Sequence, residues 1–287
     1  TVTIAGVGLA GTDAGNYSLT ANSTTTANID KAVATIDVLG YTGIYDAAAH
    51  GATGSATGVI GEDLSAGLTL GATFTNASGG AANWTFLGGI NYTDQSGSVA
   101  IVINKATATI TGDGKNGSGY FGIYDAAAHA ATATVTGVGG ATLGTVASLT
   151  TATDAGVVSH LVTYTDATGN YNNASKALKT FILKASVTLT GDGQNGSGYF
   201  GTYDAAAHAA TATVKGVGGV TVGTATTSTT HTNAGVYSDT VTFAGDSNYK
   251  GASKVLKSYI LQATVTLVGD GQNGSGYFGT YDAAAHA

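Results

Sequence analysis

The sequence predicts an all-β chain of tandem β-sandwich domains. The first observation is a repeat, because Tyr45, Tyr124, Tyr203 and Tyr281 are separated by 79, 79 and 78 residues. A period near 79 is longer than the roughly 20–50 residues of a solenoid coil and suits a sandwich slightly smaller than the ~100 residues of an antibody domain. The second observation is composition: the chain has 45 Gly and no Pro, and it is rich in Thr, Ala, Val and Ser, which favour short strands and turns.

Strand and turn signals follow one another in a fixed order within a period, for example over 105–183. Small apolar residues alternating with Thr predict strands at 106–111 (ATATIT) and 130–137 (AATATVTG). More apolar segments predict strands at 157–165 (VVSHLVTYT) and 176–183 (KALKTFIL). The words GDGKNGSG, GVGG, TDAG and DATGN predict the turns between them. No segment keeps a 3.6-residue apolar period, so we expect no long helix.

The repeat also sets the expected domain boundaries. Residues 179–190 (KTFILKASVTLT) run from the last strand of one repeat into the first strand of the next without a flexible spacer, so we expect a stiff joint and an elongated rod. The expected divisions are the C-terminal part of a domain at 1–30, complete repeats at 31–104, 105–183 and 184–261, and the N-terminal part of a further repeat at 262–287.

Each end of the chain therefore holds only part of a domain. Such a fragment leaves an apolar face and unpaired sheet edges, which are a liability in water. We expect either that the sequence is a segment of a longer protein that completes both domains, or that the two ends complement each other between molecules. The second alternative is a head-to-tail filament, because a heterologous contact by strand addition does not close on itself.

An Asn-Gly pair marks a predicted hairpin arm in three of the repeats. The first repeat lacks this arm, since TIDVLGYTGIYD passes straight through, and the arm is therefore expected to be an exposed decoration. Its Asn-Gly-Ser sequence is also an N-glycosylation signal in a host with that pathway. The candidate glycosylation sites are Asn116, Asn195 and Asn273.

Several words of the first repeat resemble a known family. These words are Tyr45-Asp46…His50, Gly61-Glu62-Asp63-Leu64, Trp84-Thr85-Phe86 and Asn91-Tyr92. They are similar to the MBG-type bacterial Ig-like repeats of large surface proteins. Residues 105–261 match more loosely, and the opening VGLAGTDAGNYSL resembles the end of a YDG-type domain of filamentous-haemagglutinin-like adhesins, which would make 1–30 the end of such a domain.

The resemblance implies tandem Ig-like β-sandwich domains arranged as an elongated rod, in an extracellular stalk or adhesin without enzyme activity. One departure is visible, because family members usually carry Gly after Tyr-Asp. This chain has Ala at that position in every copy, so we expect the turn to avoid positive φ. The residues concerned are Ala47, Ala126, Ala205 and Ala283.

The Tyr-Asp-x-x-x-His word offers three polar side chains within six residues. A catalytic interpretation needs a nucleophile, a base and a group that orients the base, and Tyr is a poor nucleophile. An Asp and a His four apart would share a face only on a helix, whereas DAAAHAA is too short for one. We expect a structural turn in which Tyr packs, Asp bonds turn amides and His begins a strand; metal binding by His and Asp is the alternative. The residues are Tyr45, Asp46, His50, Tyr124, Asp125, His129, Tyr203, Asp204 and His208.

A second recurring word resembles the tyrosine corner of Ig sandwiches, in which a Tyr hydroxyl bonds back to the main chain. Asp13 with Tyr17 and Asn233 with Tyr237 fit this pattern, whereas Val158 replaces the Tyr in the middle copy. We expect a structural role for these residues.

Charge and composition exclude several classes. The net charge is −7 and the ten Lys are dispersed along the sequence, which argues against nucleic-acid binding through phosphates. No apolar run is long enough to span a membrane, and without Cys the chain has neither disulfides nor thiolate metal sites. We expect no cofactor; calcium at the GDG loops is an alternative, although each loop has one Asp and Lys115 stands two residues after Asp113.

The resulting hypothesis is an extracellular, cell-surface structural or adhesive protein whose partners are neighbouring Ig-like repeats. An alternative is a carbohydrate- or surface-binding module that presents Tyr and Phe of the arms to surface glycans. Adjacent Tyr120 and Phe121 point to opposite faces of a regular strand, which favours the structural role.

Overall fold

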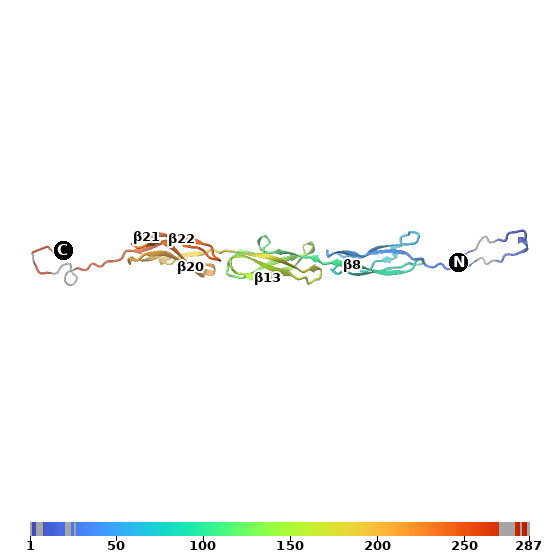
Figure 1. Cartoon of the computed structure of the whole chain (residues 1–287), viewed down its shortest axis with the longest axis horizontal. Helices are drawn as coiled ribbons and strands as arrows, with labels where there is room; N and C mark the ends of the chain where they lie inside the picture. The colour runs from blue at the N-terminus through green and yellow to red at the C-terminus, as the bar shows by residue number, and fades with distance from the viewer. Residues whose placement is uncertain are drawn as a thin grey trace. The chain divides into compact units, whose positions relative to one another are not determined.

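The computed structural model describes residues 2–3, 8–20, 24–25, 27–269, 279–281 and 283–285. The prediction of an all-β chain is confirmed, because 52% is strand and the 7% that is helical consists of three-residue 3-10 turns. Several sheets are formed, as in a β-sandwich or barrel (Figure 1). The described segments contain no helix with the length and apolar character needed to span a membrane.

The chain divides into two compact units, each described by itself. Unit 1 contains 1–109, 136–143 and 165–174, and unit 2 contains 110–135, 144–164 and 175–287. Strand parity explains why these residues form sheets: in β8, for example, Ile101 and Ile103 are buried while the residues between and after them are exposed. Small side chains such as Ala56 and Ala82, both fully buried, let the sheets approach closely.

Unit 1 contains two main sheets. β3 (Thr35–Leu39) pairs antiparallel with β5 (Thr53–Thr57). The other sheet has the order β4 (Tyr41–Ile44), β8 (Gln95–Asn104), β7 (Gly80–Phe86) and β6 (Leu68–Thr69), with β4 parallel to β8. Smaller elements are β1 (Val2–Thr3) with β2 (Thr24–Thr25), β9 (Ala106–Thr107) with β15 (Tyr171–Asn172), and the turns η1 (Ala14–Asn16), η2 (Ser65–Gly67) and η4 (Val138–Gly140). One core cluster joins Ala34 and Ala56 to Phe86 and Tyr92.

Unit 2 contains a six-stranded sheet in which two halves enclose one core. The order is β17 (Thr188–Gly191), β19 (His208–Lys215), β20 (Thr221–His231), β21 (Gly235–Phe243), β22 (Ala252–Leu261) and β18 (Tyr199–Thr202). β20 and β21 are joined at Thr226 and Thr242, and β18 runs parallel to β22. Both halves contribute to the core, with Val214 from β19 and Val241 from β21 both fully buried.

The strands between residues 109 and 183 follow the same order as the six-stranded sheet, but they form two separate three-stranded sheets. They are β10 (Thr109–Gly112), β12 (His129–Thr136) and β13 (Thr142–Ala152) in one sheet, and β11 (Tyr120–Ile123), β16 (Ala174–Leu183) and β14 (Gly156–Tyr164) in the other. Within the described residues, each sheet formed by β3 to β22 lies inside one of the ranges 31–104, 105–183 and 184–261.

The predicted Asn-Gly hairpin is wrong. Strands β10 and β11 flank the turn η3 (Lys115–Gly117) but belong to different sheets, and β17 and β18, which flank η5 (Gln194–Gly196), lie at opposite edges of theirs. Asn116 has φ 57° and ψ 32°, and the Gly114 amide donates to the Ser118 carbonyl at 2.7 Å, so the chain reverses within a closed loop. The turn η3 therefore carries the chain from one sheet to another, and η5 carries it from one edge of a sheet to the opposite edge. Asn116 and Asn195 are exposed in these turns, and Asn273 lies outside the described residues.

The expectation that Ala after Tyr-Asp avoids positive φ is also wrong. Ala47, Ala126, Ala205 and Ala283 have φ of 67°, 64°, 65° and 59°. A residue with a Cβ in this left-handed region costs about 1–2 kcal/mol relative to the right-handed one. In the copies at Ala47, Ala126 and Ala205, the turn keeps this conformation because side-chain contacts of the preceding Asp tie its ends together.

Candidate functional site

The Tyr-Asp-x-x-x-His turns place one carboxylate and one imidazole in contact. Asp125 Oδ1 accepts a hydrogen bond from the Ala127 amide at 2.9 Å and lies 2.8 Å from His129 Nε2. The other two complete copies have the same contacts, at Asp46 with Ala48 and His50 and at Asp204 with Ala206 and His208. The expectation that Asp and His meet only on a helix is therefore wrong, because the left-handed Ala brings them together in a turn.

Each of these histidines also stacks on a tyrosine from the preceding strand. The ring centroids are 3.9 Å apart for Tyr41 and His50, and 4.0 Å apart in the two later copies, Tyr120 with His129 and Tyr199 with His208. The hydrogen bond to His129 and then the Ala127 amide hold the pKa of Asp125 below its usual range. Within the described segments no third metal-ligating side chain joins such a pair. The contacts of Asp125 with Ala127 and His129, and of His129 with Tyr120, tie the turn to a strand.

The tyrosine of the Tyr-Asp-x-x-x-His motif contacts the following repeat. Tyr45 packs edge-on against Tyr171 at a centroid distance of 5.5 Å, and Tyr124 packs in the same way against Tyr249 at 5.3 Å. The third copy, Tyr203, is 40% exposed. The sequence therefore predicted that the tyrosines of this motif pack, but it did not predict that Tyr171 and Tyr249 are their partners.

An asparagine next to each partner tyrosine completes the contact. Asn170 Oδ1 accepts a hydrogen bond from the Ala77 amide at 2.7 Å, and its Nδ2 donates to Asn76 Oδ1 at 3.2 Å. Asn248 makes the equivalent bonds, to the Ala155 amide at 2.7 Å and to Asp154 at 3.0 Å. We call these two sets of contacts, each with its pair of tyrosines, the Asn-Tyr joints.

The tyrosines of the joints also order a loop through their hydroxyl groups. The hydroxyl of Tyr171 accepts a hydrogen bond from the Val138 amide at 3.2 Å, and that of Tyr249 accepts one from the Val217 amide at 3.1 Å. None of the four joint residues, Asn170, Tyr171, Asn248 and Tyr249, was expected from the sequence. The sequence feature that could have predicted them is the Asn-Tyr dipeptide, which recurs once in each repeat, at 91–92, 170–171 and 248–249.

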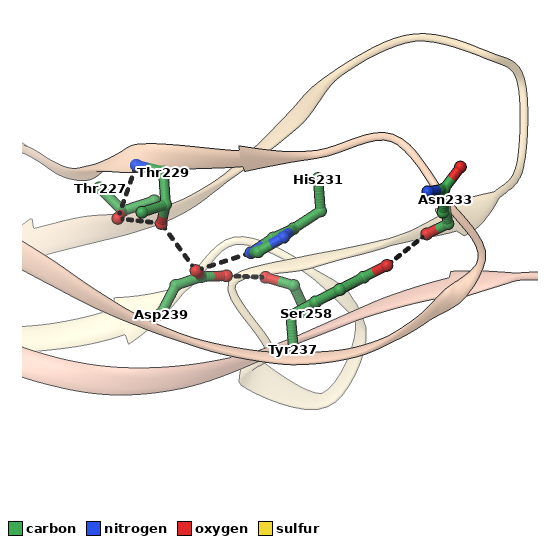
Figure 2. Close-up of polar contacts among 7 residues, drawn as sticks. All are labelled: Thr227, Thr229, His231, Asn233, Tyr237, Asp239 and Ser258. Atoms are coloured by element: carbon green, nitrogen blue, oxygen red, sulfur yellow. Dashed lines mark hydrogen bonds and ion pairs between the residues drawn. The ribbon is translucent and has the colours of Figure 1, made fainter.

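One of the two tyrosine-corner candidates has the expected contact. The Tyr237 hydroxyl donates to the Asn233 carbonyl at 2.9 Å (Figure 2). Tyr17, in contrast, is 73% exposed, and Asp13 makes no side-chain capping bond to η1. The structure therefore places a corner at the start of β21.

A buried carboxylate lies beside this corner (Figure 2). Asp239 is 4% exposed and accepts hydrogen bonds from Thr229 at 2.8 Å and from Ser258 at 3.1 Å, and it lies 2.9 Å from His231 Nε2. The His231 ring in turn stacks on Tyr237 at 3.8 Å. Burial raises the pKa of Asp239, but the hydrogen bonds from His231, Thr229 and Ser258 outweigh it and hold the pKa below its usual range.

The position of Asp239 is also occupied by a polar residue, His160, in the repeat 105–183. His160 is 3% exposed and its Nδ1 lies 2.8 Å from Thr150 Oγ1. Thr180 occupies the position of Ser258, because the two residues pair with the equivalent Tyr120 and Tyr199. Neither His160 Nε2 nor Thr180 Oγ1 has a hydrogen-bond partner in the described part of the chain.

In the first repeat both positions are apolar. Ala82 is fully buried at the position of Asp239, and Ile101, which pairs with Tyr41, takes that of Ser258. A polar residue at the position of Asp239 is thus accompanied by a polar residue at the position of Ser258 on the neighbouring strand. Neither Asp239 nor His160 was expected from the sequence, although both have the same strand parity as the buried valines 241 and 162.

The chain is therefore an all-β protein whose recurring polar contacts lie in turns, at joints and in one core. Comparison with known proteins finds no family model that matches it. No curated protein and no solved structure matches it either.

Proposed function

We propose that this chain is an extracellular, cell-surface structural protein, a stalk or fibre of tandem Ig-like β-sandwich repeats in an elongated rod. The Asn-Tyr joints carry the proposal. Asn170 and Asn248 make the same pair of hydrogen bonds to the residues ahead of them, and a tyrosine pair packs beside each. A contact repeated in kind and geometry suits a segment whose task is to hold neighbouring domains at a fixed angle.

The turns support the same proposal. Their Asp and His side chains bond to each other and to the adjacent backbone, so they serve the fold and we assign them no catalytic step. The first partners of the chain are then neighbouring Ig-like repeats. In a continuing array, exposed Tyr203 would receive the Asn-Tyr word of a further repeat, as Tyr45 and Tyr124 receive theirs.

Small-angle scattering of the whole chain tests the rod. We expect a maximum dimension close to the sum of the domains and a narrow distance distribution. The double variant Asn170→Ala/Asn248→Ala should broaden that distribution and remove the hydrogen-exchange protection of the Ala77 and Ala155 amides. Asn83→Ala, a matched change at an exposed residue of β7, is the control. A compact, broad distribution for the unchanged chain would contradict the proposal.

A head-to-tail filament assembled by strand complementation between molecules is the second arrangement that we propose. In it, exposed Tyr203 of one copy would meet Asn91 and Tyr92 of the next, as Tyr45 packs against Tyr171, next to Asn170, within the chain. Concentration-dependent fibres in electron micrographs that disappear with Asn91→Ala would support it. Monomers at every concentration on a sizing column would reject it.

A further inference from the structure

A groove of about 500 Å³ lies beside the turn η3 in unit 2. It is formed where the Asn-Gly turn and β11 meet β16. Its walls include Lys115, Phe121, Lys176, Lys179 and Phe181. Its size falls within the range of about 300–1,000 Å³ that is usual for sites of small ligands.

The base of the groove is an aromatic pair. Phe121 of β11 and Phe181 of β16 are direct neighbours in the parallel register, with ring centroids 6.2 Å apart. Phe121 remains 40% exposed despite this contact. The two rings are tilted by 43° to each other and provide an apolar platform on the outer side of the sheet.

Positive charge surrounds the platform. Three of the ten lysines line this groove, and no carboxylate lines it, although the chain as a whole carries −7. The ammonium of Lys115 lies 5.3 Å from the centre of the Phe121 ring, and that of Lys176 donates to the Ile110 carbonyl at 2.7 Å. No ion pair involves a lysine in the described segments. The lysines that looked dispersed in the sequence are gathered here by the pairing of β11 with β16.

A similar groove lies in the next repeat. A groove of about 350 Å³ is lined by Phe200, Tyr259 and Lys257, at the positions of Phe121, Phe181 and Lys179. Its aromatic rings are 5.9 Å apart, and Phe200 is also 40% exposed. Gln194 replaces Lys115, so the second groove keeps the platform and has less positive charge.

We propose that the groove formed by 115–121 and 176–181 binds an acidic saccharide, with one sugar ring against the Phe121–Phe181 pair and its carboxylate between Lys115 and Lys179. The C–H face of a pyranose is apolar and weakly positive, and it complements the negative face of an aromatic ring. The carboxylate complements the two ammonium groups, and the Asn116 amide at the rim faces the sugar hydroxyls. The net charge of −7 disfavours a long polyanion such as a nucleic acid, so the ligand is a short saccharide.

Titration of the whole chain with a galacturonic acid pentasaccharide tests this, followed by the NMR signals of the Phe121 and Phe181 rings. We expect saturable shifts that weaken with added salt, because exposed charges are screened. The matched neutral probe is a galactose pentasaccharide of the same linkage, which should bind more weakly. Equal binding of both probes, or no binding of the acidic one at millimolar concentration, would overturn the proposal. Stronger binding of an acidic peptide of equal charge would also overturn it.

The second groove supplies matched variants. Lys115→Gln introduces the residue that the second groove has at this position and should weaken binding at the first by about threefold, as the loss of one exposed ion pair implies. Gln194→Lys should strengthen binding at the second groove by a similar factor. Phe121→Ala should abolish binding at the first groove while the shifts of the Phe200 ring persist, which shows that the chain remains folded. Lys250→Gln, at an exposed lysine outside both grooves, is the control. Unchanged binding in Lys115→Gln and Phe121→Ala would overturn the proposal.

Discussion

The Ser258 hydroxyl donates a hydrogen bond of 3.1 Å to the Asp239 carboxylate, and both residues are buried. The first repeat has Ala82 and Ile101 at the same two positions. At this point of the core the repeat 184–261 therefore has a bonded polar pair, the repeat 31–104 has an apolar pair, and the repeat 105–183 has the polar residues His160 and Thr180. A polar residue at one of these positions and an apolar residue at the other is unfavourable, because a buried polar group without a hydrogen-bond partner keeps its full desolvation cost.

We predict that Asp239→Ala destabilises the strands β21 and β22 and that a second change repairs the damage. The single variant leaves the Ser258 hydroxyl and the Thr229 hydroxyl without their acceptor, which should cost about 1–3 kcal/mol. Adding Ser258→Ile recreates the apolar pair of the first repeat and should recover most of the loss. Hydrogen exchange of the β21 and β22 amides in the whole chain measures both effects. Asp37→Ala, at an exposed position of β3, is the control. Equal stability of the single and double variants would contradict the coupling.

We also predict that acid weakens this region through Asp239. Its pKa is held below the usual range in the folded chain, while an unfolded chain restores a value of about 3.9. The stabilisation is therefore fully present above the unfolded pKa and is lost as the pH falls through the lower, folded pKa. Exchange of the β21 amides measured between about pH 5 and pH 2 should show this loss. In Asp239→Asn the pH dependence from this group should vanish, and its persistence would assign the effect to another carboxylate.

The sequence could predict the strands but not every contact between them. The alternation of β21 places Asp239 on the same side as Val241, so burial of residue 239 could be predicted from the sequence. Its partner Ser258 lies on another strand, and only the register of β21 with β22 brings the two together. The groove depends in the same way on the pairing of Phe121 with Phe181.

Two predictions from short sequence motifs were wrong because tertiary contacts outweighed the local preference. Asn-Gly is a strong hairpin signal, yet the strands around Asn116 pair with different neighbours, which no rule about the turn itself contains. Ala126 adopts the left-handed conformation that a Cβ disfavours, because Asp125 bonds both the Ala127 amide and His129.

This strain makes Ala126→Gly a stabilising change. Glycine removes the cost of a Cβ at positive φ, but its greater freedom in the unfolded chain offsets part of the gain. We expect a net stabilisation of about 0.5–1 kcal/mol, measured as slower exchange of the amides at the start of β12. Ala127→Gly, which changes the neighbouring exposed Ala without a positive φ, should be neutral or destabilising. A loss of stability in Ala126→Gly would show that the methyl group makes a contact that outweighs its strain.

Tyr249→Phe separates the two roles of the joint tyrosine. The change removes the hydroxyl that accepts the Val217 amide at 3.1 Å, but it keeps the ring that packs on Tyr124. An orphaned amide in a partly buried loop should cost about 1 kcal/mol and should appear as faster exchange of the Val217 amide. The bonds of Asn248 to Ala155 and Asp154 do not involve the hydroxyl, so protection of the Ala155 amide should be unchanged. Tyr203→Phe, at a tyrosine that is 40% exposed, is the matched control and should leave both amides as they are. If Tyr249→Phe instead exposes the Ala155 amide while Val217 keeps its protection, the hydroxyl serves the joint and not the loop.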